Sequence, residues 1–258
     1  MDNNDRLDII MGELKLNKVA QIGDLAKKCF VSPCTLRRDL IQLEKRGLIH
    51  RSYGKVILQE HPNQSLPHAI RKKENCYEKQ LIGELAASLV KDGDFLLLDP
   101  SSTVEQMIPF LREKRMLSVV TNGARTSLLC QDAMPDATIY CTGGQLKPTF
   151  SGFMGSAVID CLKTFRPDIL FFSTYAMSLD SGVMDGSEEN LYTKRCMMQV
   201  ARKRVYLCDH SKLERRMCRV LCPLEDLDCV ITDRRPSAAW ERALERAGVE
   251  LLYPKEKE

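Results

Sequence analysis

The chain has 258 residues, and its 38 lysine and arginine residues nearly balance its 35 aspartate and glutamate residues, which excludes a histone-like protein but allows a local basic face. Hydrophobic residues make up 44% of the chain and charged residues 28%, as in folded globular proteins rather than disordered chains. The first residues are polar, and the longest segments without a charged side chain, such as residues 169–179, are too short to cross a bilayer, so we expect a cytoplasmic protein without membrane contact.

Residues 5–58 are predicted to form a compact helical unit. Apolar residues recur at intervals of three and four in two segments, which predicts two amphipathic helices; these residues are Leu7, Ile10, Met11 and Leu14, then Ile22, Leu25, Ala26 and Cys29. Ser32 and Pro33 are favoured at the start of a third helix, and Gly47 at its end. Two short apolar runs, residues 48–50 and 55–58, predict a hairpin, so residues 1–58 are expected to form a winged helix-turn-helix.

A linker and a larger domain follow. Residues 59–68 are polar and carry two prolines, which is typical of a linker and leaves residues 69–258 as the second domain. Beyond a helix near residues 69–91, strands are predicted at 95–98, 117–121, 137–141, 168–173, 204–208, 228–232 and 249–252, with helices near 103–114, 123–131, 187–202 and 237–247. Apolar strands separated by helices favour an α/β domain with a mostly parallel sheet covered on both faces.

The third predicted helix carries the residues expected to contact DNA. Between residues 22 and 55 there are eight lysine and arginine residues and three acidic residues, a local charge of +5 that suits phosphate contact. Arginine suits guanine or phosphate, glutamine suits adenine, and a helix N-terminus donates N–H groups to phosphate. With Leu36, Leu40 and Leu43 facing inward, the predicted DNA-binding residues are Ser32, Thr35, Arg37, Arg38, Gln42, Arg51 and Lys55. The alternatives are a solvated basic face or a protein-docking module, and Asp39 is expected to form an internal ion pair or a helix cap.

This segment resembles the DeoR-type bacterial transcription regulators. Residues 31–40, Val-Ser-Pro-Cys-Thr-Leu-Arg-Arg-Asp-Leu, are similar to the V-S-x-x-T-[IL]-R-R-D-L signature of that family. The residues that follow, Leu43 and Glu44, then Gly47, Ile49 and Arg51, are similar to its continuation. The family usually ends its wing with an H-G-G-like run, where this chain has Tyr53, Gly54 and Lys55, a difference that bears on the phosphate contacts of the wing.

Polar residues follow four of the strands predicted in the larger domain. Parallel sheets bind ligands beyond the carboxyl ends of their strands. Here these ends carry hydroxyls, an amide, glycines and a lysine, a donor set that suits a phosphorylated polyol. The residues are Asp99, Ser101, Ser102, Thr103, Thr121, Asn122, Gly143, Gly144 and Lys212. Each also has a structural interpretation, since Ser101, Ser102 or Thr103 could cap a helix and Gly143-Gly144 could form a tight turn.

The resemblance extends over this domain. Its strand-end motifs are similar to the D-x-G-[ST]-T, T-N, G-G and D-x-S-K runs of the DeoR-type effector domain, which itself resembles ribose-5-phosphate isomerase. This implies that the strand-end residues would surround a sugar phosphate. Two positions differ from the family pattern: Ser101 replaces a glycine, and Asn190 stands four residues before Lys194 where glutamate is common.

The eleven cysteines show no C-x-x-C pair and no regular spacing. We therefore expect buried thiols rather than disulfides. A zinc site at Cys218 and Cys222 with a distant histidine is an alternative that the spacing does not single out. We expect neither a metal nor a cofactor.

Three functions are compatible with these residues. The first is a repressor of a sugar-metabolism operon that binds double-stranded operator DNA as a dimer or tetramer and responds to a phosphorylated sugar. The repressing role is implied by the resemblance. The second is a sugar-phosphate isomerase using Asp99, Asp209 or Lys212 as acid, base or electrophile, although a shared fold does not transfer chemistry. The third is a DNA-binding protein whose larger domain only oligomerises.

Overall fold

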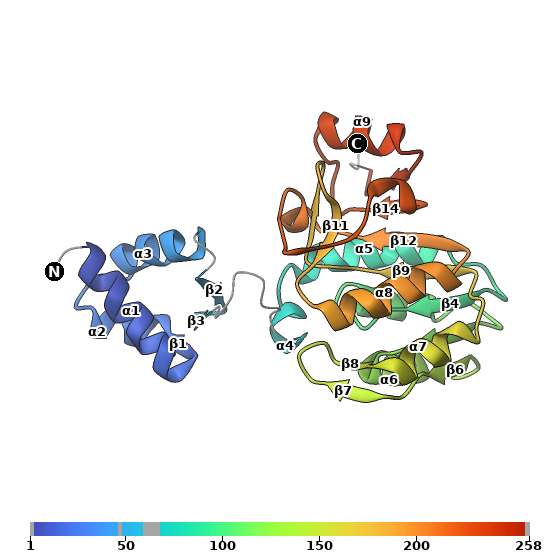
Figure 1. Cartoon of the computed structure of the whole chain (residues 1–258), viewed down its shortest axis with the longest axis horizontal. Helices are drawn as coiled ribbons and strands as arrows, with labels where there is room; N and C mark the ends of the chain where they lie inside the picture. Colours follow the sequence, from blue (N-terminus) through green and yellow to red (C-terminus); the bar gives the residue numbers. More distant parts are fainter. Residues whose placement is uncertain (1–2, 46–47, 59–67, 256–258) are drawn as a thin grey trace. The chain divides into compact units, whose positions relative to one another are not determined.

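A computed structural model describes residues 3–45, 48–58 and 68–255 of the chain (Figure 1). The chain divides into two compact units, Met1–Gln64 and Ser65–Glu258, which we call the DNA-binding unit and the sensor unit after the role that the sequence predicts for each. Of the predicted linker, residues 59–67 lie outside the described residues, and His68 begins a helix. Each unit is described by itself.

The described part of the DNA-binding unit contains three helices, α1 (Asn3–Asn17), α2 (Ile22–Lys28) and α3 (Pro33–Lys45), as the periodicity predicted. The apolar residues that defined the three helices form one core, which includes Leu7, Ile10, Leu14, Leu25, Ala26, Cys29, Leu36, Leu40 and Leu43. The Arg6 guanidinium on α1 binds the Asp39 carboxylate on α3, with 2.8 Å from Nε to Oδ2 and 3.1 Å from Nη2 to Oδ1. This ion pair confirms the internal role expected for Asp39.

A three-stranded sheet completes this unit. The predicted wing strands are β2 (Ile49–Ser52) and β3 (Lys55–Leu58), and a third strand, β1 (Val19–Gln21), pairs with β3 in the order β1-β3-β2. Tyr53 and Gly54 connect β2 to β3 with φ angles of 47° and 76°. Positive φ at both positions is the two-residue turn that matches the twist of a hairpin. β1 was not predicted because three residues are too few to show alternation.

The sensor unit is built on a parallel sheet of seven strands in its described residues, in the order β15-β14-β12-β9-β4-β5-β6. The strands are β4 (Phe95–Leu98), β5 (Ser118–Thr121), β6 (Thr138–Cys141), β9 (Ile169–Phe172), β12 (Lys203–Leu207), β14 (Cys229–Ile231) and β15 (Glu250–Leu252). All seven were predicted within one or two residues. The expected α/β class with a mostly parallel sheet is confirmed.

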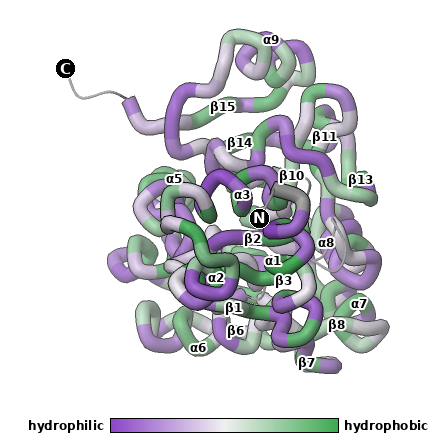
Figure 2. Tube along the Cα trace, turned by 90° about the vertical axis from the view of Figure 1, so that its left-hand side faces the viewer, coloured by the Kyte–Doolittle hydropathy of each residue, from purple (hydrophilic) through white to green (hydrophobic). Residues whose placement is uncertain are grey.

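Helices cover both faces of the sheet. Side chains on one face, such as Leu97 and Phe172, pack with α7 (Ser156–Lys163), α8 (Glu188–Val200) and α9 (Ala238–Arg246). Their strand neighbours on the other face, such as Leu96 and Phe171, pack with α5 (Cys76–Ser88), the 3-10 helix η1 (Val104–Leu111) and α6 (Ala124–Ala133). The tube of α9 carries both hydrophilic and hydrophobic residues (Figure 2). Trp240 and Leu244 of this helix belong to the buried core. Adjacent residues of a strand point to opposite faces, which explains why these strands are apolar throughout.

The structure differs from the prediction in several local elements. The helix predicted near 69–91 is two helices, α4 (His68–Arg71) and α5, because Asn75 adopts left-handed backbone angles (φ 47°, ψ 44°) between them. The segment predicted as a helix near 103–114 is the 3-10 helix η1, which contains Pro109. Elements absent from the prediction are α7, the hairpin of β7 (Gln145–Lys147) and β8 (Gly152–Met154), and a small antiparallel sheet of β10 (Ala176–Ser178), β11 (Gly182–Asp185) and β13 (Arg219–Cys222).

Close packing of α5 on η1 gives a first prediction. A Cβ added at Gly83 would lie 2.6 Å from the Gln106 carbonyl oxygen, so Gly83→Ala should lower the free energy of unfolding by about 1–3 kcal/mol. The matched control is Gly12→Ala on α1, where nothing lies within 4 Å of the added atom, and where alanine should stabilise the helix by about 0.5–1 kcal/mol. Urea unfolding followed by circular dichroism measures both effects. Equal stability of Gly83→Ala and the wild type would contradict the packing.

Candidate functional site

The carboxyl ends of adjacent strands carry the polar residues of the sensor unit. In the sheet order, β12, β9, β4, β5 and β6 are neighbours, and each is followed by a polar loop. Because the strands are parallel, these loops meet along one edge of the sheet, which we call the rim. The expected convergence of the four predicted loops follows from this topology.

Lys212 contacts side chains from two other loops of the rim. Its ammonium donates to the Ser173 hydroxyl at 2.7 Å and to the Thr103 hydroxyl at 3.2 Å, and lies 3.5 Å from the Asp209 carboxylate. Three loops, which follow β4, β9 and β12, therefore share one lysine. Ser173 was missed in the sequence, although it directly follows β9 and the strand-end rule would have selected it.

Asp99 and Lys194 form a buried ion pair beneath this cluster. The Lys194 ammonium lies 2.9 Å from Asp99 Oδ2 and donates to the Ser173 carbonyl at 2.6 Å. Asp99 also accepts from the backbone N–H groups of Ser101 and Ser173 at 2.9 and 3.2 Å. Both carboxylate oxygens are thus engaged within the protein. We therefore expect Asp99 to fix the shape of the loop after β4 rather than to bind a ligand directly.

The departure at Asn190 has a physical explanation in the same region. The Asn190 amide donates to Asp185 Oδ2 at 2.7 Å, and both side chains are buried. Burial raises the pKa of Asp185, although the nearby Lys194 ammonium opposes that effect. A glutamate at position 190 would place a second carboxylate against Asp185, whereas the amide supplies a hydrogen bond.

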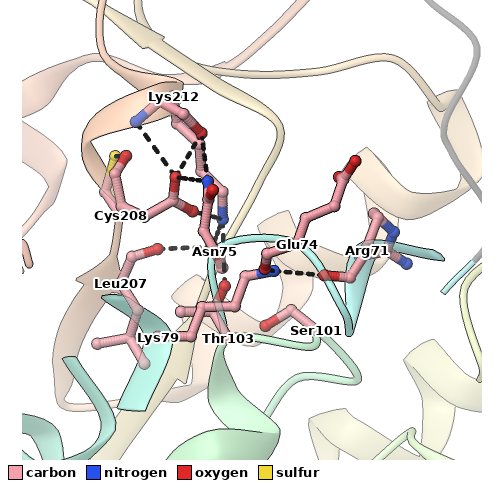
Figure 3. A network of polar contacts seen from close by, with 12 residues as sticks. Arg71, Glu74, Asn75, Lys79, Ser101, Thr103, Leu207, Cys208 and Lys212 are labelled. Atoms are coloured by element: carbon pink, nitrogen blue, oxygen red, sulfur yellow. Dashed lines mark hydrogen bonds and ion pairs between the residues drawn. The ribbon is translucent and has the colours of Figure 1, made fainter. Parts of the chain in front are cut away.

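Lys79 lies beside the Lys212 cluster (Figure 3), and the Asp209 carboxylate lies 3.5 Å from the Lys212 ammonium. Burial alone would raise the pKa of Asp209, but the Lys212 ammonium and the Ser211 hydroxyl lower it to about 2. The Asn75 amide donates to Asp209 Oδ1 at 2.9 Å and to the Ser211 hydroxyl at 3.0 Å. Burial and the nearby Lys212 charge lower the pKa of Lys79 to about 8. Two ammonium groups, those of Lys79 and Lys212, therefore stabilise the ionised Asp209 carboxylate at this end of the rim. Neither Asn75 nor Lys79 was predicted, since both lie on the segment interpreted as a covering helix.

Thr121 and Asn122 occupy the neighbouring part of the rim. The Thr121 hydroxyl donates to the Leu98 carbonyl at 2.6 Å, and the Asn122 amide donates to the Phe153 carbonyl at 2.9 Å. The Asn122 side chain is fully buried, and its Oδ1 atom has no hydrogen-bond partner within the described residues. A buried acceptor without a donor is costly, and a bound hydroxyl would satisfy it.

In the part of the chain that the structure describes, the other residues predicted to lie on the rim do not bind the Lys212 ammonium. The Ser101 hydroxyl accepts from the N–H of Val104, the first residue of η1, at 3.2 Å, while Thr103 occupies the N-cap position, and Ser102 is buried. Gly143 and Gly144 have φ angles of 64° and 113° and lie next to the β7–β8 hairpin. Within the described residues, the hydrogen bonds and ion pair of the Lys212 ammonium go to Thr103, Ser173 and Asp209 and not to these glycines. The structure therefore brings together Asp99, Thr103 and Lys212, places Thr121 and Asn122 on the next strand, and leaves the two glycines one strand further away.

The predicted DNA-binding residues lie mainly on α3. The Ser32 hydroxyl accepts from the Thr35 N–H at 3.2 Å, which confirms Ser32 as the N-cap of this helix. Arg37 and Arg38 are exposed on α3, and Lys55 is exposed at the start of β3. The described residues give these three side chains no hydrogen bond or ion pair. They are therefore accessible to a nucleic acid, as the hypothesis requires.

Two predicted DNA contacts are engaged within the protein. The Arg51 guanidinium binds the Glu44 carboxylate, with 2.8 Å from Nε to Oε2, and Gln42 is half-buried. The Glu44 carboxylate also accepts from the Arg51 N–H at 2.9 Å, which ties α3 to β2. Arg51 keeps further N–H donors, so its contact with DNA stays a prediction.

The cysteines are free thiols, six of them buried, and burial raises the pKa of Cys130, Cys208, Cys222 and Cys229 to about 12. Cys222 is buried and Cys218 is exposed, and within the described residues no three histidine, cysteine or acidic side chains gather as metal ligands would. Across the same residues, no helix is both long and apolar enough to cross a membrane.

Comparison with known families matches both units. Residues 6–61 match the DeoR-like helix-turn-helix domain, and residues 74–234 match the DeoR C terminal sensor domain. The chain belongs to the DeoR family. This membership confirms the predicted class, a DNA-binding transcription regulator rather than an enzyme.

Individual proteins are also similar to this DeoR-family chain. The HTH-type transcriptional repressor GlcR of Bacillus subtilis (strain 168) is 33% identical over 258 residues, covering 100% of this chain and 99% of that protein. The lactose phosphotransferase system repressor of Staphylococcus aureus (strain NCTC 8325 / PS 47) is 26% identical, covering 90% of this chain and 93% of that one. The solved structure of ribose 5-phosphate isomerase A from Methanocaldococcus jannaschii is 18% identical, with a TM-score of 0.41 over 54% of this chain and 55% of that chain.

Proposed function

We propose that this DeoR-family chain is a repressor of a sugar-metabolism operon, and that a phosphorylated sugar bound at the rim controls its hold on the operator. The relatives named as repressors, one of them of a lactose phosphotransferase system, support the class of target. The DNA-binding contacts would come from α3 and the wing, through Arg37, Arg38 and Lys55. Such proteins read two-fold symmetric sites, so we propose that the chain acts as a dimer or tetramer.

The observation that carries the ligand proposal is the Lys212 cluster. One ammonium, two hydroxyls within 3.2 Å of it and a third on Ser211 lie at the carboxyl ends of parallel strands, where α/β sheets bind ligands. A phosphate group requires several strong donors around it, and charge-assisted hydrogen bonds are the strongest available. The unpartnered Asn122 oxygen supports a ligand that carries hydroxyl groups, because it would accept from one of them.

The ligand would control DNA binding through a difference between its affinities for the DNA-bound and the DNA-free chain. The ligand can move the balance between DNA-bound and DNA-free chains only if it binds one of those forms more tightly. The coupling factor is the ratio of the DNA dissociation constants with and without ligand. Whether the ligand releases or promotes DNA binding is the sign of this coupling, and the experiment below measures it.

Lys212→Met tests the ligand site. The chain is titrated onto its own upstream DNA at fixed salt by fluorescence anisotropy, with and without glucose 6-phosphate, fructose 6-phosphate, ribose 5-phosphate or inorganic phosphate. The wild type should bind at least one sugar phosphate and change its DNA affinity. Lys212→Met should bind that ligand roughly 10- to 100-fold more weakly, the loss of one hydrogen bond from a charged group. Its DNA affinity without ligand should stay at the wild-type value.

The control is Lys163→Met, an exposed lysine on α7. Its ligand response should equal that of the wild type. An unchanged response in Lys212→Met would show that the ligand binds elsewhere. If no phosphorylated sugar in the panel raises the melting temperature of the wild type, the larger domain is better explained as an oligomerisation domain alone.

A further inference from the structure

The segment that connects the linker to the sensor unit is fixed to the rim. Along the chain it comprises α4, the turn at residues 72–75 and the start of α5, and we call residues 68–79 the tether. It is the part of the sensor unit through which the chain continues to the DNA-binding unit. Its contacts with the rest of the sensor unit therefore fix the position of His68, at the end of the linker.

The tether has two attachments at its beginning. The His68 N–H donates to the Thr149 carbonyl at 3.1 Å, and the His68 ring lies 3.1 Å from the buried carboxylate of Glu105. Arg71 donates to the same Thr149 carbonyl at 3.3 Å, and its guanidinium carbon lies 5.2 Å from the centre of the Tyr175 ring. These contacts place α4 against the loop after β7 and the loop after β9.

The third attachment, Asn75, is made to the rim itself. The Asn75 amide donates to Asp209 and to Ser211, which lie three residues and one residue before Lys212 in the loop after β12. Asn75 and Lys212 are labelled in Figure 3. Asn75 is also the residue whose left-handed backbone breaks the helix between α4 and α5. Asparagine tolerates this conformation better than most residues. One residue thus does both: its backbone sets the bend of the tether, and its side chain makes the contact with the rim.

Lys79 connects the start of α5 to the end of α4 and to the turn between the two helices. Its buried ammonium donates to the carbonyl of Arg71 at 2.5 Å and to that of Glu74 at 2.6 Å. These two carbonyls belong to the end of α4 and to the turn. Because Lys79 links the turn to α4, a displacement of Asn75 would also move Arg71.

A bound phosphate would compete for the groups that hold Asn75. Asp209 accepts from Asn75 and Ser211 and lies 3.5 Å from the Lys212 ammonium, and a phosphate at Lys212 would accept from the same kinds of donor. A second anion close to the buried Asp209 carboxylate is repelled unless the donors rearrange between the two anions. The Asn75 amide is the one of these donors that belongs to the tether.

We infer that Asn75 is the coupling residue of this regulator: it senses the phosphorylated ligand at the rim and transmits its binding through the tether to the linker. This inference rests on the proposed function and adds to it the residue through which the ligand acts. Asn75 is a positioning residue here, since it acts through the tether on a distant DNA contact.

The test compares three full-length variants. Asn75→Gly removes the amide and keeps a residue that adopts positive φ without strain, and Asn75→Ala removes the amide at a cost to the backbone. Gln80→Ala removes an exposed amide from the same helix, α5, and is the matched control. For each chain, calorimetry measures the affinity for the sugar phosphate selected in the panel above, and anisotropy measures the DNA affinity with and without it. Melting followed by Trp240 fluorescence checks the fold of the sensor unit.

We expect a ligand-dependent change in DNA affinity of 10-fold or more in the wild type and in Gln80→Ala. In Asn75→Gly and Asn75→Ala this change should fall below about 3-fold, while the ligand affinity changes by less than about 5-fold. Hydrogen exchange in residues 68–79 should respond to the ligand in the wild type and not in Asn75→Gly. A purely structural role would lower the melting temperature without removing the coupling.

The outcomes separate the two proposals. If the wild type responds and Asn75→Gly responds by the same factor, the coupling role is overturned and the proposed function stands. If Asn75→Gly no longer binds the ligand, Asn75 is a binding residue and the coupling role is again overturned. If the wild type neither binds a phosphorylated sugar nor changes its DNA affinity with one, the proposed function fails and the inference fails with it.

Discussion

Arg38→Ala is expected to weaken binding to the operator by about 1–3 kcal/mol, or roughly 5-fold to 150-fold. Arg38 is exposed on α3, and the described residues give it no internal partner, so its guanidinium can reach DNA without breaking a contact in the protein. If it binds a phosphate, the slope of log affinity against log salt should fall by about 0.9. If it binds a guanine, the loss should be concentrated on the specific sequence. Anisotropy titrations at several salt concentrations, on operator and on unrelated DNA, distinguish the two.

The matched control for this prediction is Arg242→Ala, an exposed arginine on α9 of the sensor unit. It removes the same charge from the chain, so it shows how much of the effect is due to net charge alone. The ligand affinity of Arg38→Ala should equal that of the wild type. Equal DNA affinities for Arg38→Ala and Arg242→Ala would contradict the assignment of α3 as the DNA-reading helix.

The exposure of Arg37 and Arg38 depends on how the acidic residues of the same unit are used. Asp39 is bound by Arg6, and Glu44 is bound by Arg51, so two of the acidic side chains closest to these arginines in the sequence are neutralised internally. The remaining positive charge is directed to solvent. Because Asp39 and Glu44 are paired inside the unit, the exposed surface near Arg37 and Arg38 is basic.

The parts of the fold that were predicted are those specified by neighbouring residues. The start of α3 follows from Ser32 and Pro33, because a cap and a first-turn proline act within three residues. The strands of the large sheet follow from short apolar runs, because a strand buried on both faces tolerates little else. The rim followed from a topological rule, since the carboxyl ends of parallel strands lie along one edge.

The missed features depend on residues far apart in the sequence. Asn75, where the helix breaks, binds Asp209 and Ser211, more than 130 positions later, and nothing local at Asn75 distinguishes it from a surface asparagine. Lys194 looked like a helix residue in a family motif, and only the fold shows that its partner is Asp99. Contacts of this range carry no periodicity, so sequence patterns cannot reveal them.

The buried pair of Lys194 and Asp99 gives the prediction with the largest effect on stability. Lys194→Met should lower the free energy of unfolding of the sensor unit by about 3–5 kcal/mol, because it leaves Asp99 and Asp185 buried without their cation. Urea unfolding followed by the fluorescence of Trp240 measures this unit selectively, since Trp240 is buried on α9 and is the single tryptophan of the chain. The control is Lys163→Met, exposed on α7, which should change the stability by less than about 0.5 kcal/mol.

A double variant tests whether the loss of unfolding free energy in Lys194→Met comes from the uncompensated charge of Asp99 or from lost packing. In Lys194→Met with Asp99→Asn, the amide no longer requires a cation, so the double variant should be more stable than the sum of the two single effects predicts, by about 1–3 kcal/mol. Additive losses would show that the two side chains act independently and that packing dominates. The pair also holds the backbone of Ser173, whose hydroxyl binds Lys212. Loss of the pair should therefore weaken ligand binding at the rim even under conditions in which the variant is folded, whereas Lys163→Met should leave ligand binding unchanged.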